Sequence, residues 1–180
     1  FRRVLFRSFD KALDLFSRQQ DPFFGLVFTS SFHSPFDIPA GRLSAEDEGL
    51  TPKQRAVKYA DWALGRFLEE LESKPYSDRT LVLIVADHDE RIRGANLVPV
   101  DNFHVPGVFL GSSVPRRIIV QPVSQLDLLP TTLALLGISA SIPAVGRNLL
   151  TLPEDEPGWA VMQFGQNHGY LRGNQLVVHQ

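Results

Sequence analysis

The alternation of apolar and polar residues divides the chain into short helices and strands. Phe9 to Arg18 carries apolar residues at helical spacing, and a second, longer helix is expected after Thr51. Thr51 suits the N-cap of that helix, Pro52 suits its first turn, and Gln54 completes a capping box. The helix is expected to bury an apolar stripe made of Val57, Ala60, Leu64, Phe67, Leu68 and Leu71.

Continuous apolar runs predict buried strands. Residues 23–29 form one such run after an Asp-Pro breaker, and residues 81–86 form another. "VPGVFLG" and "RRIIVQPV" predict two further short strands. "AVMQFG" and "NQLVVH" are expected to be closing strands on either side of a turn at residues 166–173.

Residues 124–138 predict a helix that is interrupted at Pro130 and ends at Gly137. Strands that alternate with helices indicate an α/β fold with a mostly parallel sheet flanked by helices. The chain has 180 residues, of which 43% are hydrophobic and 21% charged, so a single globular domain is expected.

Charge and composition exclude several classes of protein. The net charge of −2 argues against a nucleic-acid-binding protein, which usually carries a basic patch. The chain has no cysteine, so it contains neither a disulfide framework nor a thiolate zinc site. No apolar run approaches the roughly 20 residues that a membrane helix needs, and no signal peptide is visible.

The first residues of the chain have an unusual origin by our interpretation. "RRVLFRS", residues 2–8, is the translation of AGA CGT GTG CTC TTC CGA TCT, which matches a common sequencing adapter. We therefore expect residues 1–8 to be an artefact, and residues 9–180 to be the C-terminal half of a catalytic domain. Recovery of the same codons from source DNA would contradict this hypothesis.

The apolar run at residues 81–86 ends abruptly in titratable residues. A continuous apolar strand is typical of the buried centre of a parallel sheet, and ligands bind beyond the carboxyl ends of such strands. Asp87 and His88 offer one carboxylate and one imidazole, which suit Zn²⁺ or Mn²⁺. Both can reach one ion only if the backbone turns directly after Asp87. The alternative is that Asp87 caps a turn and His88 is a surface residue.

Two other histidines also lie beside predicted strand ends. His33 follows the run at residues 23–29, and His104 lies 16 residues after His88, before the next apolar run. Together with Asp87 and His88 they predict one pocket for a metal ion and an anion. Arg91 is a candidate contact for a phosphate group.

The remaining histidines, His168 and His179, have no comparable setting and are expected to be surface or packing residues. Other catalytic motifs are missing from the sequence. It contains no Gly-x-Ser-x-Gly elbow, no Walker A loop and no Gly-x-Gly-x-x-Gly fingerprint. These absences leave the predicted metal pocket as the main candidate site.

Four segments give the chain a family resemblance. "FTSSFHSPF", "LVLIVADH", "RIRGANLVPVDNFHVPGVFLG" and "VSQLDLLPTTLALLGI" with "PAVGRNLL" occur in this order. From about Phe9 to Gln180 the chain resembles the C-terminal half of the sulfatase-like catalytic domain of the lipoteichoic acid synthase family, of the Gram-negative type, within the alkaline phosphatase superfamily. The resemblance implies an incomplete α/β domain of that superfamily.

The resemblance also implies a function. Family members transfer phosphoglycerol or phosphoethanolamine from a phospholipid to a cell-envelope acceptor through a phosphothreonine intermediate, using Mn²⁺ or Zn²⁺. By position, Asp87 and His88 would be metal ligands, and His33 would be catalytic, binding the phosphate or steadying the leaving oxygen. His104 and Arg91 would bind the substrate phosphate.

In that family the nucleophilic threonine, the first acidic metal ligand and the membrane-spanning region precede the part that this chain resembles. We therefore expect weak metal affinity and no turnover from the chain by itself. The whole protein would be an inner-membrane enzyme with a periplasmic catalytic domain, acting on a phospholipid head group and a glycan or lipid-linked acceptor. A sulfatase or phosphodiesterase of the same superfamily, or a non-catalytic remnant of the fold, are the alternatives.

Overall fold

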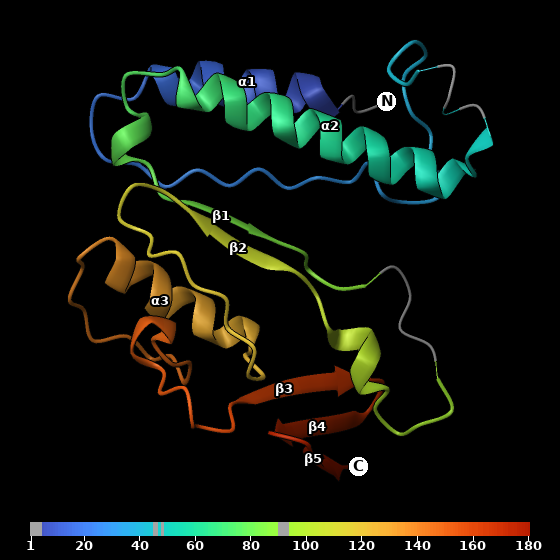
Figure 1. Cartoon of the computed structure of the whole chain (residues 1–180), viewed down its shortest axis with the longest axis vertical. Helices are drawn as coiled ribbons and strands as arrows, with labels where there is room; N and C mark the ends of the chain where they lie inside the picture. Colours follow the sequence, from blue (N-terminus) through green and yellow to red (C-terminus); the bar gives the residue numbers. More distant parts are fainter. Residues whose placement is uncertain (1–4, 45–46, 48, 90–93) are drawn as a thin grey trace. The chain divides into compact units, whose positions relative to one another are not determined.

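The computed structural model describes residues 5–44, 47, 49–89 and 94–180, and it divides into two compact units (Figure 1). The first unit spans Phe1–Asp78 and the second spans Arg79–Gln180. In the first unit, helix α1 (Leu5–Ser17) lies alongside helix α2 (Pro52–Glu72). The short 3₁₀ helix η2 (Ser77–Arg79) follows α2 and crosses the boundary to the second unit. None of the helices described here has the length and apolar character that crossing a membrane requires.

Helix α2 begins as its sequence predicts. The Thr51 hydroxyl accepts the Gln54 N–H at 3.3 Å, and the Gln54 side chain accepts the Thr51 N–H at 3.0 Å. Pro52 occupies the first helical position, where its missing N–H costs nothing. The capping box therefore forms from residues that are neighbours in the chain.

The buried face of α2 differs in part from the predicted stripe. Phe67 and Leu71 are buried as expected, and the Phe67 ring stacks on Phe9 of α1 with centroids 4.7 Å apart. Val57, however, is half exposed, and Tyr59 is fully buried in its place. A tyrosine can supply a buried ring because its hydroxyl finds a partner, here the Phe6 N–H at 3.5 Å. The remaining buried residues of this two-helix core are Leu5, Ala12, Leu13, Ala56 and Ala63.

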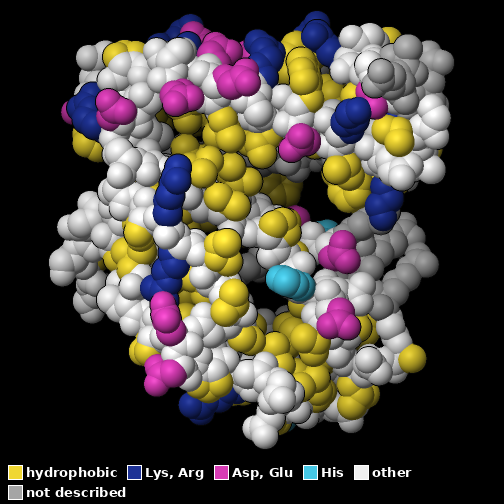
Figure 2. All heavy atoms as spheres, in the orientation of Figure 1, with side chains coloured by type: hydrophobic (Ala, Val, Ile, Leu, Met, Phe, Trp, Pro, Cys, Tyr) yellow, Lys and Arg dark blue, Asp and Glu magenta, His cyan; other side chains and the backbone are white. Residues whose placement is uncertain are grey.

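The predicted buried strand at residues 23–29 is wrong. The segment is extended but has no strand assignment, and Phe24 and Phe28 are 88% and 72% exposed. A strand is buried only when other strands or helices cover it, and none of the described residues forms a ladder with this segment. Large apolar side chains of this segment consequently lie open to solvent. Figure 2 shows that hydrophobic side chains occupy parts of the surface in view.

The second unit begins with a two-stranded antiparallel ribbon. Strand β1 (Val82–Val85) pairs with β2 (Gly107–Leu110), with Val82 opposite Leu110 and Val85 opposite Gly107. Both strands were expected from the sequence, but β1 is partly exposed rather than central. The mostly parallel sheet is not confirmed, because both sheets in the described residues are antiparallel. The chain thus forms an α/β structure with small antiparallel sheets.

The segment "RRIIVQPV" is not a strand, which corrects a second prediction. Its polar side chains hold it in place instead of a backbone ladder. Arg117 donates to the carbonyls of Leu149, Leu150 and Leu152 at 2.9–3.4 Å, and Gln121 donates to two further carbonyls in the same loop. Ile118 is left 88% exposed. The apolar run predicted burial, but pairing requires a neighbouring strand that the described residues do not supply.

The predicted helix at residues 124–138 is present as 3₁₀ helix η4 (Gln125–Asp127) followed by α3 (Leu128–Leu135). Pro130 does not interrupt α3, because it lies in the first turn, where the backbone N–H needs no helical acceptor. Gly137 follows the helix with a φ of 67°, so the expected stop is confirmed. The other 3₁₀ helices of this unit are η3 (Val100–Phe103) and η5 (Leu149–Thr151).

The chain ends in a three-stranded antiparallel sheet of β3 (Trp159–Phe164), β4 (Asn167–Arg172) and β5 (Gln175–His179). The turn expected at residues 166–173 is therefore wrong, since most of it is strand β4. Two tight turns flank β4, and each contains a glycine in the left-handed region, Gly165 at φ 61° and Gly173 at φ 58°. These glycines allow three strands where the sequence pattern suggested two.

Candidate active site: the Asp87–His88 loop

The loop that follows β1 carries the predicted metal ligands. The β1–β2 ladder continues one step past the strands, as the Ala86 N–H donates to the Pro106 carbonyl at 3.3 Å. The chain then bends at Asp87 and His88. The His88 N–H donates to Asp87 Oδ1 at 2.9 Å, which holds this bend. This bend meets the condition for both side chains to reach one ion, and it equally fits the alternative in which Asp87 caps a turn and His88 lies on the surface.

The side chains of Asp87 and His88 lie close together. His88 Nδ1 lies 2.5 Å from the Asp89 carbonyl oxygen and donates to it, because a carbonyl only accepts. His88 Nε2 lies 3.5 Å from Asp87 Oδ2. Both side chains are more than half exposed, at 65% for His88 and 59% for Asp87. With a neutral imidazole these two atoms would be acceptors for one cation, and with a protonated imidazole they would form an ion pair.

Gln125 positions this loop. Its side-chain amide, at the start of η4, donates to the carbonyls of Ala86 and Asp87 at 2.9 and 3.0 Å. These bonds fix the backbone on either side of the Asp87 Cα. Sequence analysis assigned no role to Gln125, although it stands in the Ser-Gln-x-Asp segment that carried the family resemblance. Gln125 reaches residues that precede it by 38 and 39 positions in the sequence, so local sequence pattern does not reveal these contacts.

His104 approaches the same end of the ribbon. It follows η3 and precedes β2, and it is exposed. Since Ala86 pairs with Pro106, His104 stands two residues before the end of this ladder and Asp87 one residue after it. Arg91, the other candidate phosphate contact, lies outside the described residues.

His33 belongs to the first unit. It opens a tight turn in which the Phe36 N–H donates to the His33 carbonyl at 2.8 Å. The ring Nδ1 donates to the Ser34 carbonyl at 2.9 Å. The side chain is exposed. A common pocket for His33 and the Asp87–His88 loop stays a prediction.

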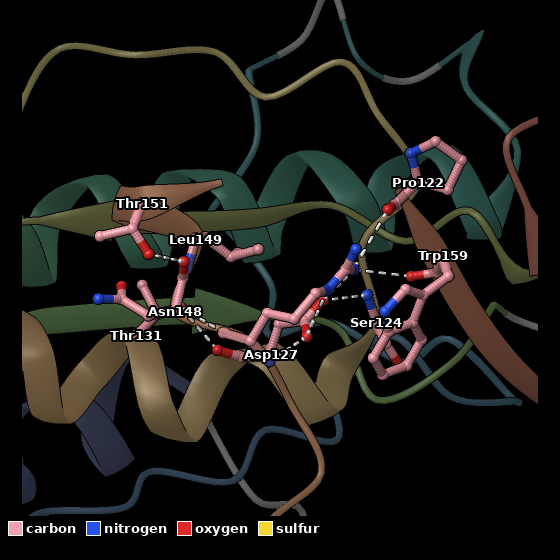
Figure 3. Close-up of polar contacts among 9 residues, drawn as sticks. Pro122, Ser124, Asp127, Thr131, Asn148, Leu149, Thr151 and Trp159 are labelled. Carbon is pink, nitrogen blue, oxygen red and sulfur yellow. Dashed lines mark hydrogen bonds and ion pairs between the residues drawn. The ribbon is translucent and has the colours of Figure 1, made fainter. Parts of the chain in front are cut away.

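A second polar cluster, around Asp127, lies between η4 and η5 (Figure 3). Asp127 is completely buried. Its Oδ1 accepts the Arg147 N–H at 2.7 Å and Nε at 3.3 Å, and its Oδ2 accepts Arg147 Nη2 at 2.7 Å and the Ser124 N–H at 2.8 Å. With four donors on two oxygens the carboxylate has no capacity left for a metal ion. Asp127 is therefore a structural residue.

The Asp127 cluster holds η4 and thereby the Gln125 side chain. Thr131 extends the cluster by donating to the Asp127 carbonyl at 2.6 Å and accepting the Leu149 N–H at 3.0 Å. Gly146 permits the close approach of the two segments, since a Cβ at that position would lie 1.9 Å from the Leu126 carbonyl oxygen. The cluster thus determines where the donor that orients the Asp87 loop is placed.

Asp87 and His88 are chemically suitable ligands for a divalent cation, but two ligands are fewer than the three or four that proteins usually supply to zinc. A carboxylate and a neutral imidazole are ligands that Zn²⁺ and Mn²⁺ accept. Among the described residues no group of three or more histidine, aspartate or glutamate side chains is arranged to hold a metal ion. Asp87 and His88 would therefore supply at most two ligands, and their role as metal ligands stays a prediction.

The chain is similar in sequence to sulfatases and to a lipoteichoic acid synthase. The sequence profile of the Sulfatase family matches residues 5–138. The chain is similar to a sulfatase of Formosa agariphila, with 27% identity over 122 residues, which cover 62% of this chain and 24% of that protein. It is also similar to the lipoteichoic acid synthase of Staphylococcus saprophyticus, with 24% identity over 150 residues, covering 72% of this chain and 23% of that protein.

A solved structure resembles nearly the whole chain. It is the crystal structure of a protein in the alkaline phosphatase superfamily from Vibrio parahaemolyticus, with a TM-score of 0.89 and 39% sequence identity. The similarity covers 97% of this chain and 44% of that chain. The chain thus spans about a quarter of the length of the curated relatives it matches, and less than half of the Vibrio protein.

Proposed function

The chain belongs to the Sulfatase family, and from this premise we propose that it carries part of the catalytic centre of a metal-dependent phosphotransferase. The enzyme moves phosphoglycerol, or phosphoethanolamine, from a phospholipid to a cell-envelope acceptor through a phosphothreonine intermediate. The observation that carries this proposal is the convergence of Asp87 and His88, with Nε2 and Oδ2 3.5 Å apart and their backbone held by Gln125.

Each candidate residue has a role in this reaction. Members of this superfamily generally use divalent metals, and Asp87 and His88 would hold Mn²⁺ or Zn²⁺. The bound ion would polarise the phosphoryl oxygens. His33, when protonated, donates to the oxygen of the leaving group, and His104 and Arg91 contact the phosphate.

Two considerations support transfer from a lipid. The similarity to lipoteichoic acid synthase extends over 72% of the chain, and the segments that contain His33, His104 and the Asp87–His88 pair occur in that family's order. We propose a location at the inner membrane, with the catalytic domain on its periplasmic side. Its acceptor would be a glycan or a lipid-linked sugar.

Hydrolysis of a sulfate ester is the second candidate function. Its specific support is that the matching profile is the Sulfatase family and that a choline-sulfatase of Rhizobium meliloti is 27% identical over 130 residues. A carboxylate–imidazole pair that binds a metal suits either a phosphate or a sulfate group. The nucleophile distinguishes the two: threonine favours the transferase, and cysteine or serine in the Cys/Ser-x-Pro-x-Arg motif favours the sulfatase.

The decisive test is an assay of the complete protein encoded by the gene, since the chain spans about a quarter of its curated relatives. Fluorescent phosphatidylglycerol and an aryl sulfate are supplied separately with Mn²⁺ or Zn²⁺. We expect release of diacylglycerol from the lipid and no sulfate release. His88→Ala should reduce lipid turnover by at least 100-fold.

The matched control is Asp101→Asn, which removes an exposed carboxylate in η3 and should leave the rate within twofold of wild type. Sulfate release without lipid turnover would establish the second candidate. Full lipid turnover by His88→Ala would exclude the role assigned to the Asp87–His88 pair.

A further inference from the structure

We propose that His168 and His179 form a second divalent-cation site, of the Zn²⁺-binding type, on the outer face of the β3–β4–β5 sheet. The register of β4 and β5 places these two histidines directly opposite each other. Figure 1 shows the two strands side by side at the C-terminal end of the chain. Residues that face each other across antiparallel strands have Cβ atoms about 4.5–5.5 Å apart and point to the same side of the sheet.

The exposure pattern identifies the face on which the histidines lie. Met162 and Gly169 are buried on one face, where a Cβ on Gly169 would lie 3.2 Å from the Val98 side chain. Side chains alternate along a strand, so His168, next to Gly169, projects from the opposite face. Both histidines are exposed there. Gln163 of β3 stands opposite His168 and completes a row of three polar side chains across the sheet.

The chemistry of this row favours a borderline metal ion. Two neutral imidazoles at this separation can both bind one Zn²⁺ with bonds of about 2.0–2.1 Å, and water fills the other positions. The neighbouring row on the same face consists of Val161, Tyr170 and Val177, so no lysine or arginine adjoins the pair there. Since the chain has no cysteine, no thiolate competes for the ion.

A shared ion would tie β4 to β5. Both ligands are in register only when the hairpin is folded, so the ion binds the folded state and stabilises it. The site lies outside the Asp87–His88 loop and does not depend on the phosphotransferase proposal. From the sequence both histidines were expected to be surface or packing residues, and the turn expected at residues 166–173 would not have set His168 opposite His179.

The test is a Zn²⁺ titration of the complete 180-residue chain without an affinity tag, in the His88→Ala background, so that the Asp87–His88 pair does not contribute. Calorimetry should show one ion bound per chain. In ¹⁵N-labelled protein the ring signals of His168 and His179 should shift together at that stoichiometry, while those of His33 and His104 stay in place. His168→Ala and His179→Ala should each weaken binding at least tenfold.

The alanine variants could lose binding because they misfold, so a variant that is expected to gain affinity is also needed. Gln163→His adds a third imidazole to the row and should tighten Zn²⁺ binding at least tenfold, with the ring signal of the added imidazole shifting in concert. The matched control Gln175→His adds an imidazole at the other end of the sheet, opposite Arg172, and should not tighten binding. Independent shifts of the two native rings, or single variants with unchanged affinity, would overturn the proposal.

Discussion

Two aspartates of the second unit, Asp127 and Asp87, have opposite environments. Asp127 is completely buried, and its two oxygens accept four hydrogen bonds from Arg147 and Ser124. Asp87 is 59% exposed, and its Oδ2 faces the imidazole of His88. The saturated carboxylate has no further chemistry available, whereas the open one can bind an ion. Both stand in segments that carried the family resemblance, so the motif alone does not separate structure from function.

The two aspartates are nevertheless linked. Asp127 holds η4, and Gln125 at the start of η4 donates to the backbone around Asp87. A buried cluster in which all four acceptor sites of Asp127 are used thus supports an exposed loop, as the outer residues of metal sites support their ligands. Four experiments can break or sharpen this comparison.

The largest effect is expected from Asp127→Ala. It leaves the Arg147 guanidinium, only 16% exposed, without its counter-ion, and should destabilise the second unit by about 3–5 kcal/mol. Urea denaturation followed by tryptophan fluorescence measures this, because Trp159 lies under Arg147 at 4.3 Å. The comparison variant Asp87→Ala should change the unfolding free energy by less than about 0.5 kcal/mol, because Asp87 is exposed. Equal losses for the two variants would refute the contrast.

Gly146→Ala tests whether close packing supports the Asp127 cluster. The added Cβ would lie 1.9 Å from the Leu126 carbonyl oxygen and 2.8 Å from the Asp127 nitrogen, so the backbone must move. We expect a loss of about 1–3 kcal/mol in unfolding free energy. Gly107→Ala is the control, because its Cβ would meet no atom within 4 Å. An unchanged unfolding free energy for Gly146→Ala would show that Gly146 and the Leu126–Asp127 segment are less tightly packed than the structure indicates.

Gln125→Ala tests the connection between the two clusters. It removes both donors to the Asp87 backbone, and we expect a several-fold weaker affinity for Mn²⁺ or Zn²⁺ with a stability loss of about 1 kcal/mol. Calorimetry with each metal, alongside thermal unfolding, measures the two quantities separately. Gln121→Ala removes a comparable pair of bonds to carbonyls in the loop after η5 and should leave the affinity unchanged. The same drop in both variants would point to a general loss of structure.

The smallest effect concerns Asp47 in the first unit, a third carboxylate that is buried yet paired with a half-exposed cation. The hydrogen bond from Lys58, followed by those from Ser44, lowers the pKa of Asp47 below its ordinary value. A lowered folded-state pKa adds stability above the ordinary aspartate pKa of about 4, and this is lost as pH falls through the folded value. Asp47→Asn should therefore be less stable than wild type at pH 6, with the difference shrinking toward pH 3. A constant difference would contradict the pKa shift.

The sequence predicted those features that depend on neighbouring residues. Thr51 and Gln54 are three positions apart, so the capping box is encoded locally, as is the stop at Gly137. The bend after Asp87 was only a condition for metal binding, and the metal site itself stays a prediction. The roles of Gln125 and Asp127 were missed, since each acts on residues 20 or more positions away.

By itself, then, the sequence determined the start of α2, the stop at Gly137 and the family to which the chain belongs, while Asp87 and His88 as metal ligands stay a prediction. Only the tertiary structure decided which apolar runs are paired, because a strand needs a partner that local pattern does not specify. For that reason residues 23–29 lie exposed while residues 82–85 are paired. The same holds for His168 and His179, which only the register of β4 against β5 places opposite each other. Pairing and register are contacts between distant residues, and the folded backbone alone records them.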